Sequence, residues 1–234
     1  MSIAENVRSV QARIAAAAER SGRRAEDIVL VAASKTNSAE RVREALSAGI
    51  AVFGENRVQE MAEKAALGAY DGAELHFIGH LQRNKVKQAV ALVSLIHGVD
   101  SEPLLHAIDA AAAAAGKIQD VLLEINVAGE ETKSGFSPAA LGAAIECASA
   151  LRCVRVRGLM TVPPICASGE ENRRYFERIK QLFIDNCDKK YDNVHMDFMS
   201  MGMSGDFETA IECGANMVRV GTAIFGERVY PGRS

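Results

Sequence analysis

The feature that most constrains the fold is a regular alternation of short β-branched runs with Ala/Glu/Lys/Arg-rich stretches of helical period. A leading helix is predicted over residues 4–20, the first strand begins at Ile28, and the last strand is predicted over residues 217–225. Eight β-then-α units follow one another without a Pro/Gly/Ser-rich linker. Such repetition favours a parallel sheet covered by helices, and eight units favour closure. We therefore predict a single α/β TIM barrel, (β/α)8, with an extra N-terminal helix.

The predicted elements account for nearly the whole chain. Strands are expected over residues 28–35, 50–56, 75–81, 92–99, 121–127, 154–162, 194–202 and 217–225. After the leading helix, helices are expected over residues 38–48, 58–67, from about 83, 102–115, 138–150, 170–187 and 206–213. The alternative is a doubly wound open sheet, which would want a phosphate loop after the first strand. Neither G-x-G-x-x-G nor G-x-x-x-x-G-K-S/T occurs in the sequence.

Length and charge narrow the class of protein. One α/β barrel uses about 200–250 residues, so residues 1–234 are expected to form one domain. Lys and Arg number 27 against 30 Asp and Glu, which gives a formal net charge of −3. The chain also has no Trp, and aromatic residues make up 5% of it. These values exclude a strongly basic or aromatic nucleic-acid surface, so no nucleic-acid partner is expected.

The cysteines and the N-terminal segment point to a cellular compartment. Five cysteines form an odd set without a C-x-x-C pair, unlike a disulfide framework or a structural zinc site. Free thiols suit a reducing cytosol. The N-terminal segment mixes acidic and basic residues, unlike a signal peptide. No apolar stretch approaches the length of about 18 residues that a membrane span requires. We expect a cytoplasmic protein without a metal site or a membrane partner.

Polar residues gather at the predicted C-terminal ends of the strands, where barrel enzymes place their active sites. They are Ser34, Lys35, Asn56, His80, Asn126, Ser200, Ser204, Arg219 and Thr222. Lys35 ends an apolar strand and so faces the barrel mouth. Desolvation there favours the neutral amine, which is the form that attacks carbonyl groups to give Schiff bases. The other reading of Lys35 is a lysine that snorkels at a strand end.

Two glycine-containing segments fall after the seventh and eighth strands, where barrels commonly bind phosphate. In the first, Ser204 or Asp206 lies near a helix N-terminus, although Asp206 is equally explained as a simple N-cap. In the second, Gly221 and Thr222 offer backbone N–H groups and a hydroxyl. Arg219 shares parity with Gly221 and needs a partner inside an apolar strand, a carboxylate being one option. An amine opposite a phosphate cradle would suit a phosphorylated aldehyde, of which pyridoxal 5′-phosphate (PLP) is the obvious candidate.

The chain resembles the pyridoxal phosphate homeostasis proteins, whose fold is that of the alanine racemase barrel domain without its second domain. The matching motifs, in chain order, are ASKT at 33–36, FGENRVQE at 53–60, HFIGHLQRNK at 76–85, TKSG at 132–135, RGLM at 157–160, SMGMS at 200–204 and VRVGTAIFG at 218–226. Leu75 and Phe198 depart from the family pattern, which usually has an aromatic and a leucine there. Both departures concern packing, because neither position supplies a polar ligand.

The resemblance implies that PLP is held as a Schiff base on Lys35 and that Arg219 contacts the pyridine nitrogen. It also implies phosphate contacts from Ser204, Gly221 and Thr222, with Asn56 lining the ring. Ser200 completes the predicted cofactor-binding set. His80 stands in a matching motif but is also explained as a solvent-facing loop residue.

Arg219 and the tyrosines bear on whether such a protein is an enzyme. A charged arginine can only donate, so it leaves the pyridine nitrogen unprotonated and the ring a weak electron sink. A racemase would need a second base, a tyrosine in the related racemases, and Tyr70, Tyr175, Tyr191 and Tyr230 all fall away from predicted strand ends.

We predict a non-catalytic monomer that buffers PLP or delivers it to apo forms of PLP-dependent enzymes. The alternatives are a PLP-dependent amino-acid racemase or lyase, with His80 or a partner-supplied group as the second base, and a cofactor-free Schiff-base aldolase.

Overall fold

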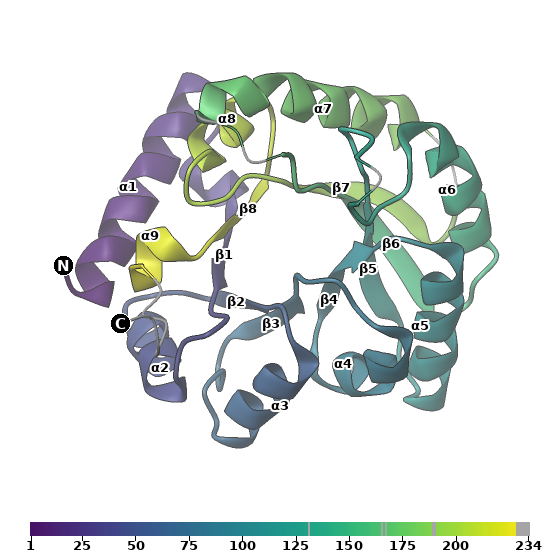
Figure 1. The fold of residues 1–234 in the computed structure, drawn as a ribbon, viewed down its shortest axis with the longest axis horizontal. Coiled ribbons are helices and arrows are strands. Elements are labelled where there is room, and N and C mark those ends of the chain that lie inside the picture. Colours follow the sequence, from purple (N-terminus) through teal and green to yellow (C-terminus); the bar gives the residue numbers. More distant parts are fainter. Residues whose placement is uncertain (131, 165, 167, 189–190, 228–234) are drawn as a thin grey trace.

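The eight strands form one closed barrel in chain order, from β1 to β8, and each strand is parallel to its neighbours. The computed structural model describes residues 1–130, 132–164, 166, 168–188 and 191–227. Figure 1 looks along the barrel, with the helices arranged as an outer ring. Pairing of β1 with β8, in the register Val29↔Met217 and Val31↔Arg219, closes the sheet. The predicted (β/α)8 barrel with an extra N-terminal helix is therefore confirmed.

Helices and strands alternate throughout the described residues. The strands are β1 (Val29–Ala33), β2 (Val52–Glu55), β3 (Glu74–Phe77), β4 (Leu95–Val99), β5 (Gln119–Glu124), β6 (Val154–Met160), β7 (Val194–Ser200) and β8 (Met217–Val220). The α-helices are α1 (Ile3–Arg20), α2 (Ala39–Ser47), α3 (Val58–Ala66), α4 (Val86–Leu92), α5 (Glu102–Ala114), α6 (Leu141–Ser149), α7 (Arg173–Cys187), α8 (Phe207–Glu212) and α9 (Thr222–Phe225). Short 3-10 helices are η1 (Ala25–Asp27), η2 (Arg83–Lys85), η3 (Pro138–Ala140) and η4 (Gly169–Asn172).

The apolar residues divide into two cores because successive strand residues point to opposite faces of the barrel wall. The small inner core fills the barrel and consists of Val31, Ala33, Ile78, Leu95, Leu122, Met160 and Met217. The larger outer core lies between the wall and the helices, and Phe53, Phe77 and Phe176 are among its largest fully buried side chains. The interior is thus packed rather than open, and polar residues that share it have been placed there by strand parity.

The leading helix α1 is specified by its own sequence. Ser2 is the N-cap, since its hydroxyl accepts the N–H of Glu5 at 3.2 Å while the Glu5 carboxylate accepts the N–H of Ser2 at 2.8 Å. Val7, Val10 and Ile14 share one buried face of this helix. At its start, the Asn6 side chain donates to the carbonyl of Ile224 at 2.9 Å, so the first helix contacts the last described one.

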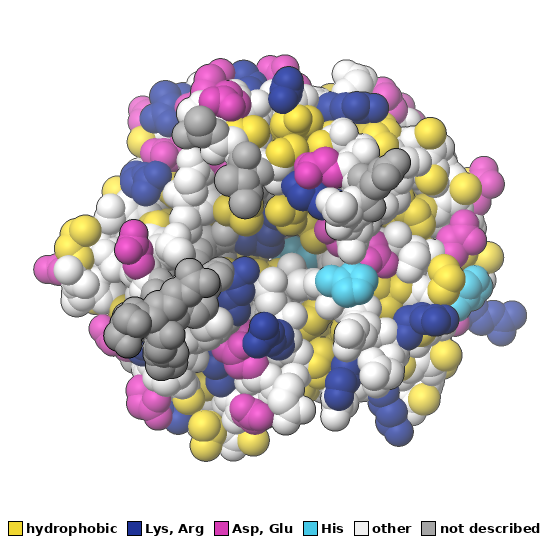
Figure 2. All heavy atoms as spheres, viewed as in Figure 1, with side chains coloured by type: hydrophobic (Ala, Val, Ile, Leu, Met, Phe, Trp, Pro, Cys, Tyr) yellow, Lys and Arg dark blue, Asp and Glu magenta, His cyan; other side chains and the backbone are white. Residues whose placement is uncertain are grey.

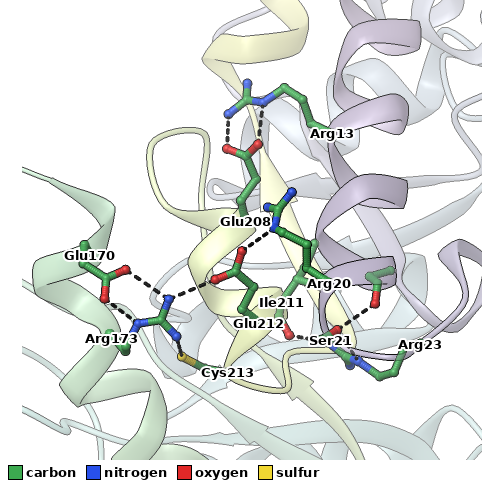
Figure 3. Close-up of polar contacts among 11 residues, drawn as sticks. Arg13, Arg20, Ser21, Arg23, Glu170, Arg173, Glu208, Ile211, Glu212 and Cys213 are labelled. Atoms are coloured by element: carbon green, nitrogen blue, oxygen red, sulfur yellow. Dashed lines mark hydrogen bonds and ion pairs between the residues drawn. The ribbon is translucent and has the colours of Figure 1, made fainter.

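Ion pairs join α1 to α8, and a further ion pair joins α8 to the start of α7 (Figure 3). Arg13 contacts both carboxylate oxygens of Glu208, at 3.2 and 2.6 Å. Arg20 contacts Glu212 at 2.8 Å, and the other oxygen of Glu212 lies 2.9 Å from Arg173. Partly exposed pairs of this kind contribute little singly, but a network shares the cost of ordering its side chains. The network fixes α1 beside α8 and η4–α7 on the outside of the barrel.

One glycine is required for the barrel wall to close between β6 and β7. Gly158 has φ +138°, and a Cβ added there would lie 1.9 Å from the carbonyl oxygen of Phe198. The register between these strands shifts beside it, between Val156 and Gly158. Only glycine tolerates both this backbone and this approach.

Most of the predicted strands were too long, and the strands predicted to end at residues 81 and 127 end at Phe77 and Glu124. Two further boundaries were wrong because the chain is helical there. The strand predicted over 217–225 ends at Val220, and Thr222–Phe225 forms the short helix α9. The β-branched pattern is misleading there because the N–H groups of Ile224 and Phe225 both donate to the Gly221 carbonyl, which turns the chain. The strand predicted from residue 92 begins at Leu95, because Leu92 is the last residue of α4.

Within the ranges that the structure describes, no helix is both long and apolar enough to cross a membrane. In the same residues, no group of three or more His, Cys, Asp or Glu side chains is arranged to hold a metal ion.

Candidate functional site

The candidate site lies at the barrel mouth on the face where α9 follows β8 (Figure 1). Figure 2 shows this face hollowed near its centre, with Lys or Arg and His side chains around the hollow. Along β1, Val31 and Ala33 point into the barrel, and the same alternation turns Ser34 outward and Lys35 inward. Lys35 is half-buried, two residues beyond the end of the strand. The neighbouring strand β8 carries Arg219 with the same inward parity.

Arg219 is buried in the barrel interior, and both of its terminal nitrogens make hydrogen bonds. Nη1 donates to the carbonyl and the hydroxyl of Ser200 at 2.9 and 2.6 Å, and Nη2 donates to the Thr161 carbonyl at 2.8 Å. Burial lowers the pKa of the Arg219 guanidinium to about 10, although the carboxylates of Glu124 and Asp206 act in the opposite direction. A carboxylate was one option for the partner of Arg219, and the structure supplies two carbonyls and a hydroxyl instead. The guanidinium remains charged at neutral pH and is held in one orientation.

Ser200 lies beneath Arg219 and is completely buried. Besides Arg219, its hydroxyl contacts Nδ1 of His97 at 3.0 Å. His97 continues inward to His76, whose own ring lies 3.4 Å from Glu74 at the opposite mouth of the barrel. In the structure, Ser200 therefore acts as the support of Arg219 and as the last link of a polar chain through the core.

Ser204 marks the second half of the site, between β7 and α8. Its hydroxyl accepts the N–H groups of Gly221 and Ala223, at 3.2 and 3.3 Å. Thr222, between these two residues, is exposed at the first turn of α9. These contacts bring the segments after β7 and β8 together. A phosphate here would meet the hydroxyls of Ser204 and Thr222 and would share the N–H groups of Gly221 and Ala223 with Ser204.

Asn56 follows β2 at the same end of the barrel and is half-buried. Its side-chain oxygen is inaccessible to solvent and has no hydrogen-bond partner among the described residues. Gly79 packs against its backbone so closely that a Cβ there would lie 2.6 Å from the Asn56 carbonyl oxygen. A buried amide oxygen without a donor is costly, so this atom is a candidate contact for a ligand.

Glu124 is a site residue that sequence reasoning missed. It ends β5, is half-buried and lies in the field of Arg219, His80 and Asp100. Burial, with Asp100 next in importance, raises the pKa of the Glu124 carboxyl above its usual value. An acid within a predicted apolar strand was the available signal, and the same reasoning that singled out Arg219 applies to it.

Other predicted residues have structural tasks. Asn126 organises its own loop, because its amide donates to the carbonyls of Glu130 and Lys133 and accepts the N–H of Gly129. Asp206 accepts the N–H of Met203 at 2.6 Å and a side-chain hydrogen bond from Asn172, so its carboxylate is already occupied. These contacts make Asp206 a local turn residue; it occupies the N-cap position of α8, but its side chain makes no capping hydrogen bond.

His80 is exposed, and the described tyrosines lie away from the C-terminal ends of the strands. The His80 side chain is 59% exposed, with Nδ1 2.9 Å from Asp100. Tyr70 is buried against Glu55, whereas Tyr175 lies on α7 beside Arg174. Tyr191 is in the segment just before β7, and Tyr230 falls outside the described residues. Of the three described tyrosines, none is at the C-terminal end of a barrel strand.

Comparison with known proteins now identifies the family. A family model named alanine racemase, N-terminal domain, matches residues 2–229. The pyridoxal phosphate homeostasis protein of Aquifex aeolicus is 46% identical over 231 residues, which cover 98% of this chain and 100% of that protein. The chain belongs to the pyridoxal phosphate homeostasis protein family. The family member from Escherichia coli is 40% identical over 232 residues, with 97% of each chain covered.

Solved structures agree with this membership. PipY of Synechococcus elongatus, a structure with PLP bound, has a TM-score of 0.82 and 32% identity, covering 96% of this chain and 100% of PipY. Alanine racemase of Clostridium difficile has a TM-score of 0.69 at 17% identity, and covers 97% of this chain but 58% of the racemase. The racemase shows the shared barrel fold alone. The resemblance predicted from the sequence motifs to the homeostasis protein family is confirmed.

Proposed function

We propose that this protein binds PLP reversibly through Lys35 and buffers or delivers it inside the cell without catalysing a reaction of its own. The observation that carries the proposal is the position of Lys35 two residues beyond the end of β1, the strand that pairs with the β8 segment holding Arg219. Gly221, which follows β8, packs against the Ala33 carbonyl at the end of β1. An amine and a cluster of anion-binding donors then share one barrel mouth. PipY, a relative across the whole chain, has been solved with PLP bound.

The described residues fit each part of PLP. The donors around Ser204, Gly221 and Thr222 suit the phosphate of PLP. The buried side-chain oxygen of Asn56 can accept a hydrogen bond from a donor on the pyridine ring. Arg219 suits the pyridine nitrogen, since its guanidinium can only donate and is fixed by Ser200 and Thr161. When bound, PLP supplies an aldehyde that forms a Schiff base with a lysine amine, and Lys35 is the lysine proposed for it.

The residues present argue for holding PLP rather than for catalysis. An arginine placed at the pyridine nitrogen would leave that nitrogen unprotonated, so the ring would withdraw electrons weakly. The described tyrosines are committed elsewhere, Tyr70 to Glu55 and Tyr175 to the surface of α7. A strong base on each side of a substrate carbon is therefore not provided by tyrosine within the described residues. The named relatives are homeostasis proteins.

A PLP-dependent racemase or lyase is the second candidate, and Glu124 is the observation that favours it. Its carboxyl lies at the mouth with a raised pKa, a property that acid–base catalysts share. Sustained turnover of a defined amino acid, lost in Lys35→Ala, would establish this candidate.

The test of the proposed function is spectroscopic. Purified protein loaded with PLP should show a visible absorbance band that borohydride removes, and mass spectrometry should place the reduced adduct on Lys35. Lys35→Ala should lose the band and the adduct. Loading followed by addition of an apo form of a PLP-dependent enzyme should restore activity to that enzyme. A protein without the band, or a band retained in Lys35→Ala, would contradict the proposal.

A further inference from the structure

A buried polar cluster lies behind the backbone that carries Lys35, between the barrel wall and α3. Ser34 points outward from the end of β1, and its hydroxyl donates to Glu55 at 2.7 Å. Glu55 is fully buried, and Tyr70 donates to the same carboxylate oxygen at 2.8 Å. Glu55 thus faces away from the barrel mouth and toward the residue before Lys35.

Lys64 connects this carboxylate to a second one. Its ammonium lies 2.8 Å from Glu55 and 2.6 Å from Glu60, and the side chain of Lys64 is 7% exposed. The ammonium also donates to the carbonyl of Ser34 at 2.8 Å. One lysine side chain of α3 therefore binds the backbone immediately before Lys35 and orients two carboxylates.

The residue after Lys35 is held by the same cluster. Thr36 has φ +65°, the one positive φ outside glycine in the described part of the chain. Its N–H donates to Glu60 at 2.5 Å, and its hydroxyl donates to the carbonyl of Lys35 at 2.6 Å. A threonine in this left-handed conformation costs about 1–3 kcal/mol, so it persists only where its surroundings impose it.

We propose that Glu55, Glu60 and Lys64 form a backbone clamp whose task is to aim the Lys35 amine at the carbonyl carbon of its ligand. The clamp fixes Ser34 on one side of Lys35 and Thr36 on the other. Its members are positioning residues, because each acts on the neighbours of Lys35 and none is in the hollow. This inference rests on the proposed role of Lys35.

The chemistry explains why aim matters. The Lys35 amine adds its electron pair to the aldehyde carbon, proton transfers follow, and the carbonyl oxygen leaves as water, so amine plus aldehyde gives imine plus water. The reaction requires no oxidant or further reactant. Its rate depends on how often the amine lies within bonding reach, and small misplacements of a reacting group cost about 10- to 100-fold.

The energetics also favour a task beyond stability. Burying two carboxylates and an ammonium is expensive, and apolar residues of similar volume often stabilise a fold equally well. One oxygen of Glu55 is buried without a partner among the described residues, which adds to the cost. What the cluster provides instead is a fixed backbone conformation from Ser34 through Lys35 to Thr36.

Two ligands separate aim from general damage. PLP forms a covalent bond with an amine, whereas pyridoxine 5′-phosphate has the same ring and phosphate but an alcohol in place of the aldehyde. Glu60→Ala removes the acceptor of the Thr36 N–H. Glu63→Ala on the exposed face of the same helix is the matched control. Glu60→Gln keeps an acceptor oxygen at that position and serves as the conservative variant.

The expected result is a selective loss. Glu60→Ala should form the borohydride-sensitive band about 10-fold or more slowly, while its Kd for pyridoxine 5′-phosphate stays within about twofold of the parent. Glu63→Ala should match the parent for both ligands, and Glu60→Gln should recover most of the rate. Equal losses for both ligands, or no loss in Glu60→Ala, would overturn the clamp.

Failure of the clamp and failure of the proposed function give different results. If the parent protein yields no reduced adduct on Lys35, the proposed function is wrong, and the clamp with it, because Lys35 then forms no bond to aim. If the parent yields the adduct and Glu60→Ala yields it at the same rate, only the clamp is wrong. Thermal unfolding of each variant shows that the compared proteins are folded.

Discussion

The rings of His76 and His97 meet inside the barrel, with Nδ1 of His76 3.0 Å from Nε2 of His97. One of these two nitrogens must carry a proton and the other must not. Burial lowers the pKa of both rings, so at neutral pH the pair is a hydrogen bond between neutral rings. The second nitrogen of His97 contacts Ser200, which in turn accepts from Arg219. The orientation of Arg219 at the barrel mouth therefore depends on groups that reach back to the opposite mouth.

Replacing His97 should loosen this chain. His97→Phe keeps a planar ring but removes both polar nitrogens, which leaves His76 without its partner and Ser200 with one fewer. We expect the free energy of unfolding to fall by about 2–4 kcal/mol in a denaturant titration. His195→Phe, at an exposed position of β7, should change it by less than about 0.5 kcal/mol. Equal effects of the two substitutions would show that the polar chain has no energetic weight.

The same two histidines predict how stability depends on pH. Burial lowers the pKa of His76 to about 4, against an ordinary value of 6.5, and burial also lowers the pKa of His97 well below its ordinary value. Because both folded-state values lie below the unfolded value, the unfolded chain takes up protons first as the pH falls. The free energy of unfolding should therefore be constant above about pH 7 and decrease as the pH falls toward about 4.

Denaturant titrations at about pH 7, 6 and 5 measure this dependence. His76→Gln should flatten the curve over this interval because glutamine does not ionise. His195→Gln, at the exposed position, should leave its shape unchanged. A curve that is already flat in the parent protein would contradict the neutral histidine pair.

Glu124 predicts a dependence of the opposite sign. Its folded-state pKa is raised, first by burial and then by Asp100, so the folded protein holds this proton more tightly than the unfolded chain does. That contribution is complete below the ordinary value of 4.5 and is lost as the pH rises through the folded-state value. Glu124→Gln should therefore stabilise the protein at neutral pH by about 1 kcal/mol and by less under acidic conditions. The difference in unfolding free energy between variant and parent, measured at both pH values, decides the matter.

Ser204 is expected to contribute to the binding of the phosphate of PLP and not to the binding of its pyridine ring. Ser204→Ala removes the hydroxyl that meets the N–H groups of Gly221 and Ala223. The affinity for PLP should fall about 10-fold, equivalent to about 1.4 kcal/mol, while the affinity for pyridoxal, which has no phosphate, stays unchanged. Ser134→Ala, on the opposite side of the mouth beside His80, is the control. Equal losses of affinity for PLP and for pyridoxal would show that Ser204 does not act on the phosphate.

Local sequence pattern sufficed for the residues whose positions follow from strand parity and strand ends. Alternation along β1 and β8 points Lys35 and Arg219 to one mouth, and the glycine segments after β7 and β8 mark the Ser204–Gly221 contact. The barrel itself followed from the number and order of the βα units. Local pattern was insufficient at α9, where one backbone turn at Gly221 converts a β-like sequence into helix.

Partner choice was the part that the sequence could not give. His97 meets Ser200 across 103 positions of sequence, and Lys64 reaches Ser34 across 30. Such pairs depend on the register of strands around the barrel and on the rotation of α3 against the wall, neither of which a local pattern encodes. A buried acid such as Glu55 can be noticed in a sequence, but its partner requires the fold.

Closure of the barrel also sets when the site can exist during synthesis. Lys35 is synthesised well before Arg219, Gly221 and Ala223, and β1 can pair with β8 only after these residues have emerged. The contact from Asn6 to Ile224 waits for the same moment. Until then a growing chain carries the lysine without the donors that complete the mouth. On the proposed function, tight capture of a phosphorylated aldehyde requires β8, and a chain terminated before β8 should lack it.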